Sequence, residues 1–290
     1  MSVYIIAEAG CNHCGNMDLA QRMIEAASLA GADCVKFQTY RTDLLVGADD
    51  IRKFCRKCEL SLSDHERLIK CCADNGVDFL SSAFDIPSLN LLHGLNVANL
   101  KIPSGQIHNA EYLDNARRLF SRGKIYMSTG MSAFKEWRRA YGSLAGCNVV
   151  PMHCVTGYPV PLEQANMRGI RDIISVSAQR GYSDHTMTNT CAVMAVAMRC
   201  SVIEHHFYLD EVDCPDMPAS FCIAKLRAYI QCIRDAEIAM GAGCRKIIQP
   251  CEGKYLKRRD LTRYSDNKQG IHIKGQNSGV SGVDISGNVS

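Results

Sequence analysis

The sequence has no long apolar run, no basic run with interleaved aromatic residues and little net charge. No uncharged apolar stretch approaches the roughly 20 residues that a membrane-spanning helix needs. A formal net charge of only +3 gives no case for a nucleic-acid partner. The first ten residues lack a basic segment, and Glu8 interrupts their apolar run, so they do not resemble a signal peptide. We therefore expect a cytoplasmic protein with neither a membrane nor a nucleic acid as partner.

Cysteine, by contrast, is abundant, with 16 residues. Without an export signal we expect reduced thiols, and many of the cysteines lie in apolar runs, where they serve as small core residues. Two pairs with zinc-type C-x-x-C spacing stand out, Cys11/Cys14 and Cys55/Cys58. The gap of about forty residues between the pairs exceeds the usual zinc-ribbon spacer, so spacing alone is weak support for a structural zinc site.

Short apolar runs alternate with amphipathic segments along most of the chain. The runs predict eight strands, at residues 3–7, 33–37, 77–81, 98–102, 124–128, 148–154, 181–184 and 202–206. Helices are predicted near 17–30, 63–75, 86–94, 109–121, 133–142, 166–177, 187–199 and 219–240, with a capping box at 63–66 and a long irregular insertion at 39–62. This alternation predicts an α/β fold of the (β/α)8 TIM-barrel type, with an open doubly wound sheet as the alternative.

The composition changes after residue 248. Residues 254–263 are strongly basic, and residues 265–290 are rich in glycine, serine and asparagine with few large apolar side chains. Such a segment buries little surface. We therefore expect a barrel domain at residues 1–248 and a basic linker with a flexible tail at 249–290.

Polar or ionisable residues follow most of the predicted strands. In a barrel, chemistry lies at the C-terminal ends of the strands, and the last two predicted strands are neighbours. His185 and His206 stand at the ends of these two strands, so they can converge on one metal ion. Imidazole ligands suit manganese, cobalt, iron or zinc.

Seven segments carry a more specific pattern, in order and spread across residues 3–245. They are residues 6–15, 31–38, 100–105, 127–131, 153–159, 181–186 and 203–207. Together they resemble the N-acetylneuraminate (sialic acid) synthase family. The resemblance implies a barrel that condenses phosphoenolpyruvate (PEP) with an N-acylated amino sugar such as N-acetylmannosamine. The product is a nine-carbon 2-keto-3-deoxy sugar acid, and phosphate is released.

The resemblance also implies roles for individual residues. His185 and His206 match the family's ligands to a divalent metal, with Mn²⁺ expected first and Co²⁺, Mg²⁺ or Zn²⁺ as alternatives. Glu8 and Gln106 match positions near the reacting centre, and we assign Glu8 to proton handling or to positioning the water that attacks C2. The positions that match PEP contacts are Lys36, Ser82, Lys101, Ser104, Ser128 and Ser183, and those that match amino-sugar contacts are Gln38, Tyr158 and Asp216.

Each of these assignments has a plainer alternative. A single histidine is more often packed or solvated than a metal ligand, and Glu8 has the alternative role of a carboxylate paired with a lysine. Surface exposure is the ordinary alternative for a lysine. Lys36 and Lys101, however, lie in apolar runs, where an unpaired ammonium group is costly.

The sequence departs from the family pattern at several positions. Gln106 stands where the family usually has Glu, His205 stands where Arg is common, and Ser82 stands where some members have Thr. Family members continue into an antifreeze-like domain, which in the family dimer reaches over the partner's barrel and supplies an arginine to the acyl group. Here only a short, low-hydrophobicity tail follows residues 257–261. We therefore expect the catalytic barrel without that domain, with a homodimer as an open alternative.

These departures leave several functions open. Three hypotheses follow. The first is a working synthase with an open site, the second is a truncated non-catalytic or weakly active homologue that binds metal and PEP, and the third is a barrel with a separate lid protein. A PEP-dependent keto-deoxy sugar acid phosphate synthase is a further alternative, and its sugar would carry phosphate.

Overall fold

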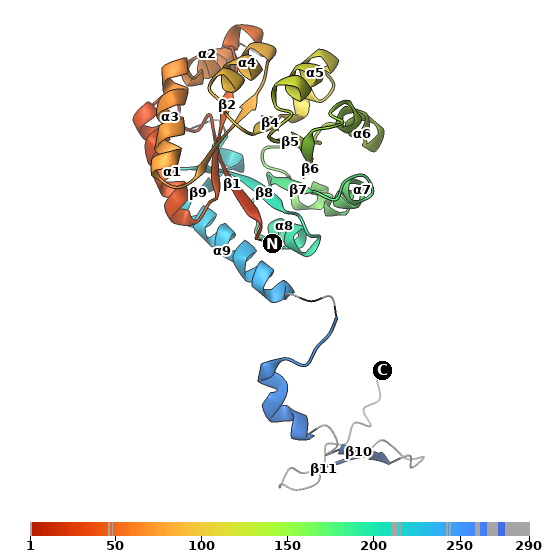
Figure 1. Cartoon of the computed structure of the whole chain (residues 1–290). Coiled ribbons are helices and arrows are strands. Elements are labelled where there is room, and N and C mark those ends of the chain that lie inside the picture. The colour runs from red at the N-terminus through yellow and green to blue at the C-terminus, as the bar shows by residue number, and fades with distance from the viewer. Residues whose placement is uncertain are drawn as a thin grey trace. The chain divides into compact units, whose positions relative to one another are not determined.

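Eight parallel strands form one barrel in the order of the sequence (Figure 1). They are β1 (Tyr4–Gly10), β2 (Cys34–Thr39), β3 (Asp78–Ala83), β4 (Leu100–Ile102), β5 (Lys124–Ser128), β6 (Asn148–Cys154), β7 (Gly181–Asp184) and β8 (Val202–Tyr208). Each strand pairs with the next, and β8 pairs in parallel with β1 from Tyr4 opposite Val202 to Glu8 opposite His206. This closing pair confirms the predicted TIM barrel, and the open doubly wound sheet is wrong.

The computed structural model describes residues 2–45, 47, 49–209, 214, 216–241, 243, 245–258, 262–265 and 272–275. The chain divides into two compact units, Met1–Met240 and Gly241–Ser290. The barrel lies within the first unit. The predicted boundary after residue 248 stays a prediction.

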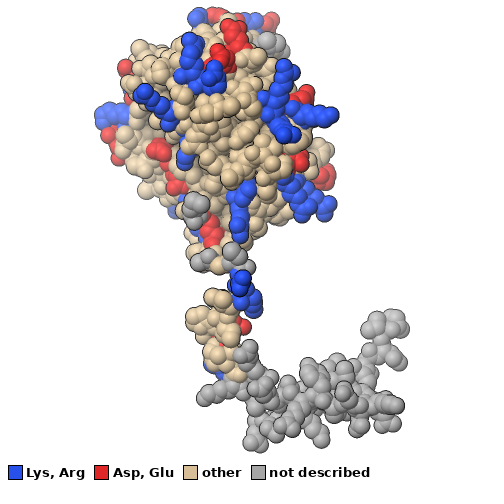
Figure 2. All heavy atoms as spheres, turned by 45° about the vertical axis from the view of Figure 1, so that its right-hand side comes forward, with Lys and Arg blue, Asp and Glu red and all other residues tan. Residues whose placement is uncertain are grey.

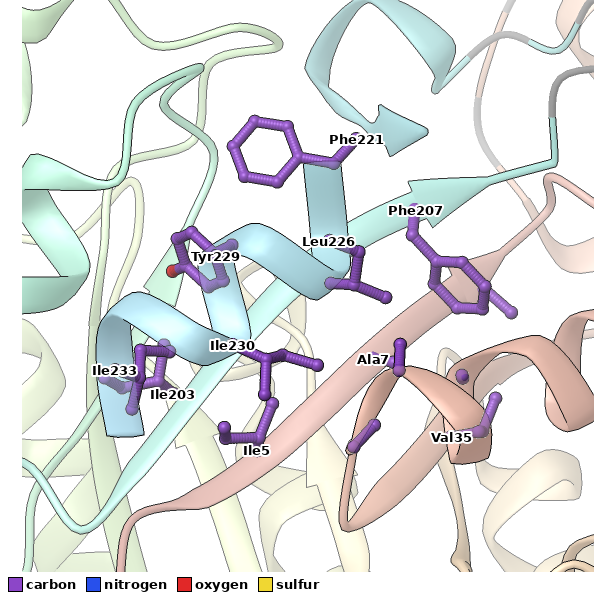
Figure 3. Packing of buried hydrophobic residues seen from close by; sticks show 14 of the residues in the cluster. Ile5, Ala7, Val35, Ile203, Phe207, Phe221, Leu226, Tyr229, Ile230 and Ile233 are labelled. Atoms are coloured by element: carbon purple, nitrogen blue, oxygen red, sulfur yellow. The ribbon is translucent and has the colours of Figure 1, made fainter. Parts of the chain in front are cut away.

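Helices surround the barrel in Figure 1. They are α1 (Met17–Ala30), α3 (Leu62–Asp74), α4 (Ile86–Gly94), α5 (Ala110–Leu119), α6 (Phe134–Ser143), α7 (Ile170–Ile174), α8 (Thr190–Ala197) and α9 (Ile223–Met240). Their apolar faces bury side chains against the outer face of the strands. Figure 3 shows this for α9, whose Ile230 and Ile233 lie over Ile5 of β1 and Ile203 of β8. The hydrophobic core therefore holds the strands in place from outside and leaves their C-terminal ends free for polar residues.

The prediction of an irregular insertion at residues 39–62 is wrong in part, because this segment contains α2 (Asp49–Cys58) and the short η1 (Thr42–Leu44). Phe54, Cys55 and Cys58 of α2 lie against buried Cys11 and Tyr40. Apolar residues at positions 51, 54, 55 and 58 have helical spacing, which is the signal that the composition-based prediction missed.

The predicted capping box at residues 63–66 is also displaced. Ser61 is the N-cap of α3: its hydroxyl accepts from the Asp64 backbone N–H at 3.2 Å, and the Asp64 carboxylate accepts from the Ser61 backbone N–H at 2.9 Å. The predicted helix at 166–177 shortens to η4 (Met167–Gly169) and α7, and Asn166, which precedes η4, takes a left-handed backbone conformation with φ 46°. The remaining short helices of the barrel unit are η2 (Ser104–Gln106), η3 (Leu162–Gln164) and η5 (Met217–Ala219) among the described residues, and β9 (Phe221–Cys222) pairs with the end of β8.

The second unit contains η6 (Pro250–Arg258) and an antiparallel pair, β10 (Thr262–Ser265) and β11 (His272–Gly275). Most of the predicted flexible tail, residues 259–261, 266–271 and 276–290, lies outside the described residues. On the face of the barrel unit shown in Figure 2, basic side chains are interspersed with acidic and uncharged ones. Among the described helices, none combines the length and apolar character needed to cross a bilayer.

Candidate active site

A cavity of about 260 Å³ opens at the C-terminal ends of the barrel strands. All of the predicted site residues except Gln106 and Asp216 line it. Those that do are Glu8, Lys36, Gln38, Ser82, Lys101, Ser104, Ser128, Tyr158, Ser183, His185 and His206. Glu204, Phe84, Pro103, Gly105, Met131, Cys154 and Thr156 complete the wall.

The strand register explains why residues so far apart in sequence meet. Glu8 of β1 lies opposite Lys36 of β2 on one side and His206 of β8 on the other. Ser82 of β3 lies opposite Lys101 of β4. Since side chains alternate between the two faces of a strand, residues paired at one level of a barrel point inward together.

Buried charges form a continuous network at the floor of the cavity. Lys36 Nζ forms an ion pair with Glu8 Oε2 at 2.9 Å, in a geometry that is not that of a hydrogen bond. The same ammonium group donates a hydrogen bond to Ser82 Oγ at 2.9 Å. Lys101 Nζ donates to Glu204 Oε2 at 2.7 Å. Two ammonium groups thus lie among two carboxylates, which makes their burial tolerable.

Glu204 is the network's central carboxylate, and the sequence analysis did not assign it a role. Its Oε1 accepts from Ser183 Oγ at 2.9 Å and lies 3.8 Å from Lys36 Nζ, so it faces both lysines. The signal that could have found it is the period of two in β8, which sends Val202, Glu204 and His206 to the same side of the strand.

The network sets the protonation states of its members. Burial raises the pKa of Glu8 to about 7, against the opposing charge of Lys36. Burial would also raise the pKa of Glu204, but Lys101 and Lys36 together hold it well below its ordinary value. Burial alone would lower the pKa of Lys36, and Glu204 and Glu8 raise it instead. Burial lowers the pKa of Lys101, against the opposing charge of Glu204. At neutral pH the site therefore has the Lys36 ammonium group, one fixed carboxylate and one carboxyl near its titration point.

His185 and His206 lie side by side above this network, with ring centroids 5.3 Å apart. His185 Nδ1 donates to the Val155 carbonyl at 2.9 Å, which leaves Nε2 as the ligand atom. His206 Nδ1 is buried without a hydrogen-bond partner in the described structure, 3.7 Å from Asp216 Oδ2. Burial and the nearby His185 lower the pKa of His206 well below its usual range, so its ring is neutral, as a metal ligand requires.

The described residues contain no group of three or more histidine, cysteine, aspartate or glutamate side chains arranged to hold a metal. The pair of histidines with the orphaned His206 nitrogen nevertheless fits a divalent cation that keeps other positions for water or substrate. Metal binding stays a prediction.

Two of the three predicted sugar-binding residues, Gln38 and Tyr158, line the cavity. The Tyr158 ring is half exposed, with its centroid 4.4 Å from that of His185. Gln38 Nε2 donates weakly to Glu8 Oε1 at 3.4 Å. Asp216 does not line the cavity, but it lies close to Gly10, where an added methyl group would be 3.2 Å from Asp216 Oδ2 and 3.4 Å from Gln38 Nε2.

Gln106, predicted as catalytic, lies outside the cavity wall. Its Nε2 donates to the Phe84 carbonyl at 2.7 Å, and its Oε1 accepts from Asn109 Nδ2 at 3.4 Å. An amide can make the first of these bonds, whereas the carboxylate that the family usually has here cannot donate to a carbonyl. The presence of Gln in place of the family's Glu therefore accounts for the direction of this side chain toward the Phe84 carbonyl. A catalytic role for Gln106 stays a prediction.

Two buried residues, Asp184 and His205, hold the segments that carry His185 and His206. Asp184 accepts from Tyr182 Oη, the Thr186 backbone N–H and Thr186 Oγ through Oδ1, and from Tyr229 Oη through Oδ2, at 2.8–3.0 Å. The ring nitrogens of His205, at the position where the family commonly has Arg, contact the Thr186 and His206 carbonyls at 2.9 and 2.8 Å. Asp184 thus positions His185 indirectly, through its hydrogen bonds to Thr186, the residue that follows His185.

We expect Asp184→Ala to lower the free energy of unfolding by about 3 kcal/mol, because it leaves several buried donors without an acceptor. Urea unfolding followed by far-UV circular dichroism measures this change. Asp114→Ala is the matched control, since Asp114 is paired only with half-exposed Arg117, and it should change stability by less than about 1 kcal/mol. Equal effects of the two substitutions would show that the Asp184 network is not structural.

The two C-x-x-C pairs meet beside the site without forming a metal group among the described residues. Buried Cys58 donates from its sulfur to the Cys11 carbonyl at 3.6 Å, and Cys11 contacts Tyr40 Oη at 3.5 Å. Tyr40 in turn donates to the Cys55 carbonyl at 3.0 Å. Cys11, Cys55 and Cys58 form no disulfide, and they join α2 to the loop after β1.

Comparisons with known proteins agree with this geometry. The profile of the NeuB family matches residues 23–245. The chain is 34% identical to the N,N'-diacetyllegionaminic acid synthase of Legionella pneumophila over 94% of this chain and 83% of that protein. It is 36% identical to the enzyme of the same name from Campylobacter jejuni over 92% and 86% of the two chains.

Solved structures show the same likeness. The N-acetylneuraminic acid (sialic acid) synthetase of Leptospira borgpetersenii superposes with a TM-score of 0.82 at 28% identity, covering 89% of this chain and 92% of that one. A truncated 3-deoxy-D-arabino-heptulosonate 7-phosphate synthase from Thermotoga maritima has a TM-score of 0.65 at 12% identity over 83% and 88% of the chains, which is a likeness of fold alone.

Proposed function

The chain belongs to the NeuB family of PEP-dependent condensing enzymes, and we propose that it joins PEP to an N-acylated amino sugar, N-acetylmannosamine or a related sugar, to give a nonulosonic acid and phosphate. The observation that carries this proposal is the pair of buried lysines, Lys36 and Lys101, at the floor of a cavity lined with serine hydroxyls. A carboxylate and a phosphate are the anions that such a set of donors binds.

The lysines and serines would hold PEP and orient its C3 toward the sugar. In the reaction, C3 of PEP bonds to the aldehyde carbon, and the aldehyde oxygen takes up a proton. Water then adds to C2, and the bond between C2 and the phosphate oxygen breaks as phosphate leaves. With a pKa of about 7, Glu8 is suited to position that water and to accept its proton.

His185 and His206 would hold the divalent metal, Mn²⁺ or a related cation. When bound, the metal supplies Lewis acidity toward the aldehyde oxygen. Tyr158 and Gln38, which line the cavity, and Asp216, which lies close to Gly10, would fix the sugar's hydroxyl and acyl groups. A homodimer and a cytoplasmic location stay predictions.

The test is an assay of the full chain with PEP, Mn²⁺ and N-acetylmannosamine, in which released phosphate and keto-deoxy acid are both measured. We expect the two products in equal amounts, with none after chelation by EDTA. Arabinose 5-phosphate and erythrose 4-phosphate serve as comparison substrates, and turnover of these alone would support the sugar acid phosphate synthase instead. No product from any of several amino sugars, despite metal and PEP binding, would support the non-catalytic homologue.

A further inference from the structure

The amide of Gln38, which lines the cavity, has different surroundings at its nitrogen and at its oxygen. Its Nε2 donates weakly to Glu8 Oε1 at 3.4 Å. A methyl group added at Gly10 would lie 3.4 Å from this nitrogen, 3.4 Å from Glu8 Oε1 and 3.2 Å from Asp216 Oδ2. The space over Gly10 is therefore bordered by two carboxyl oxygens and one N–H donor. Carboxylate oxygens only accept hydrogen bonds, so this space favours the nitrogen end of the amide over the oxygen end.

The oxygen of the Gln38 amide lies against a thiol. Cys11 Sγ donates to Gln38 Oε1 at 3.4 Å. A second contact joins the same sulfur to Tyr40 Oη at 3.5 Å. The Tyr40 hydroxyl gives its one proton to the Cys55 carbonyl at 3.0 Å and has none left for Cys11. Cys11 is therefore a hydrogen-bond donor here, and Gln38 Oε1 is the nearer of its two acceptors.

The C-terminal end of α2 holds Cys11 in place. Cys58 Sγ donates to the Cys11 carbonyl at 3.6 Å, and Cys11, Tyr40 and Cys58 are buried in one cluster. The Cys58 thiol, followed by burial, raises the pKa of Cys11 well above its usual range, so Cys11 keeps its proton at neutral pH. The donor that faces the Gln38 oxygen is thus both fixed and protonated.

We propose that Cys11 is a positioning residue for the amino sugar: its thiol holds the Gln38 oxygen, so that the Gln38 amide presents its N–H group to the substrate. This inference rests on the proposed function, in which Gln38 binds the sugar. Without the thiol, the amide loses the bond on its oxygen, and the weak bond to Glu8 holds it less firmly. An amide turned the other way cannot donate to an acyl carbonyl of the sugar.

The test removes the donor with Cys11→Ala and keeps a donor with Cys11→Ser. In the condensation assay with PEP, Mn²⁺ and N-acetylmannosamine, we expect Cys11→Ala to raise KM for the sugar about tenfold and to leave KM for PEP within about twofold of the wild type. Cys11→Ser should keep KM for the sugar within about threefold of the wild type, because its hydroxyl also donates.

Cys58→Ala is the matched control. It removes a buried thiol from the same cluster and leaves the bond between Cys11 and Gln38 in place, so KM for the sugar should not change. Equal increases of this KM in Cys11→Ala and Cys58→Ala would show that packing of the cluster, and not the Cys11 donor, matters for the sugar, and would overturn the inference.

A double-mutant cycle shows whether Cys11 acts through Gln38. We expect Gln38→Ala to raise KM for the sugar, and we expect the addition of Cys11→Ala to this variant to have little further effect. Full addition of the two single effects would mean that Cys11 acts on the sugar by another route, which contradicts the inference.

A measurement without turnover separates this inference from the proposed function. With ¹⁵N-labelled glutamine, the side-chain signals of Gln38 are identified by their loss in Gln38→Ala. Their heteronuclear NOE should show a rigid amide in the wild type and in Cys11→Ser, and a mobile amide in Cys11→Ala. If no sugar is turned over, the proposed function fails while this NOE still decides the inference. Cys11→Val, which fills the space without a donor, replaces Cys11→Ala if that variant does not fold, and a Gln38 amide that stays rigid without the thiol would overturn the inference.

Discussion

Replacing Glu204 by glutamine is expected to reduce turnover at least about 100-fold and to lower the free energy of unfolding by about 3 kcal/mol. The substitution keeps the shape of the side chain but removes the charge that faces both Lys36 and Lys101. Lys101 then has no carboxylate partner in the network, and its ammonium group loses the position from which it would bind PEP. Urea unfolding and steady-state phosphate release at pH 7 measure the two effects.

The pH dependence of stability gives an independent check on Glu204. Because its pKa is lower in the folded chain than the ordinary value of 4.5, its charge stabilises the fold above that value, and this contribution is lost as the pH falls further. The unfolding free energy of Glu204→Gln should therefore fall less steeply than that of the wild type below about pH 4.5. Exposed Glu163 provides the control Glu163→Gln, which should match the wild type. Wild-type turnover by Glu204→Gln would show that the two lysines act without this carboxylate.

The barrel and most of its cavity could be predicted because both follow from local patterns. Alternating apolar runs and helical faces define strands and helices, and a closed parallel barrel brings all strand ends together. The two histidines needed no further information, since each directly ends or follows a predicted strand, whereas the roles of Lys36 and Lys101 came from the family resemblance. Glu204 was overlooked, although its place two residues before His206 puts it on the inner face.

Features set by loops could not be predicted in the same way. The direction of Gln106 depends on the Phe84 carbonyl in a neighbouring loop, and Asp216 Oδ2 lies near Gly10, at 3.2 Å from where a methyl group added there would stand. A second cavity, lined by residues between Thr129 and Ile173, was not predicted either, because its walls come from several separate segments. Long-range packing decides all three.

Glu8→Gln is expected to lower kcat by about 100-fold or more and to remove a titration from the pH profile of turnover. With its pKa raised to about 7 by burial, Glu8 is half ionised near neutrality, so wild-type activity should rise as the pH increases through about 7. Glutamine accepts no proton, and the rate that remains should not show this rise. Rates from pH 5.5 to 8.5, with KM for PEP measured at each pH, test both effects.

Stability should respond to Glu8 in the opposite direction from Glu204. A carboxyl whose pKa is higher in the folded chain than its ordinary value of 4.5 favours folding most at low pH, and this advantage is lost as the pH rises from there to about 7. Glu8→Gln should therefore flatten the wild-type decline in stability over that interval, while Glu8→Asp keeps an ionisable group and a rising pH profile of turnover. If Glu8→Gln kept both the affinity for PEP and full turnover, Glu8 would be only the partner of Lys36 and another group would handle the proton. The two carboxylates of one buried network thus differ in role because Glu204 faces two ammonium groups and Glu8 faces one.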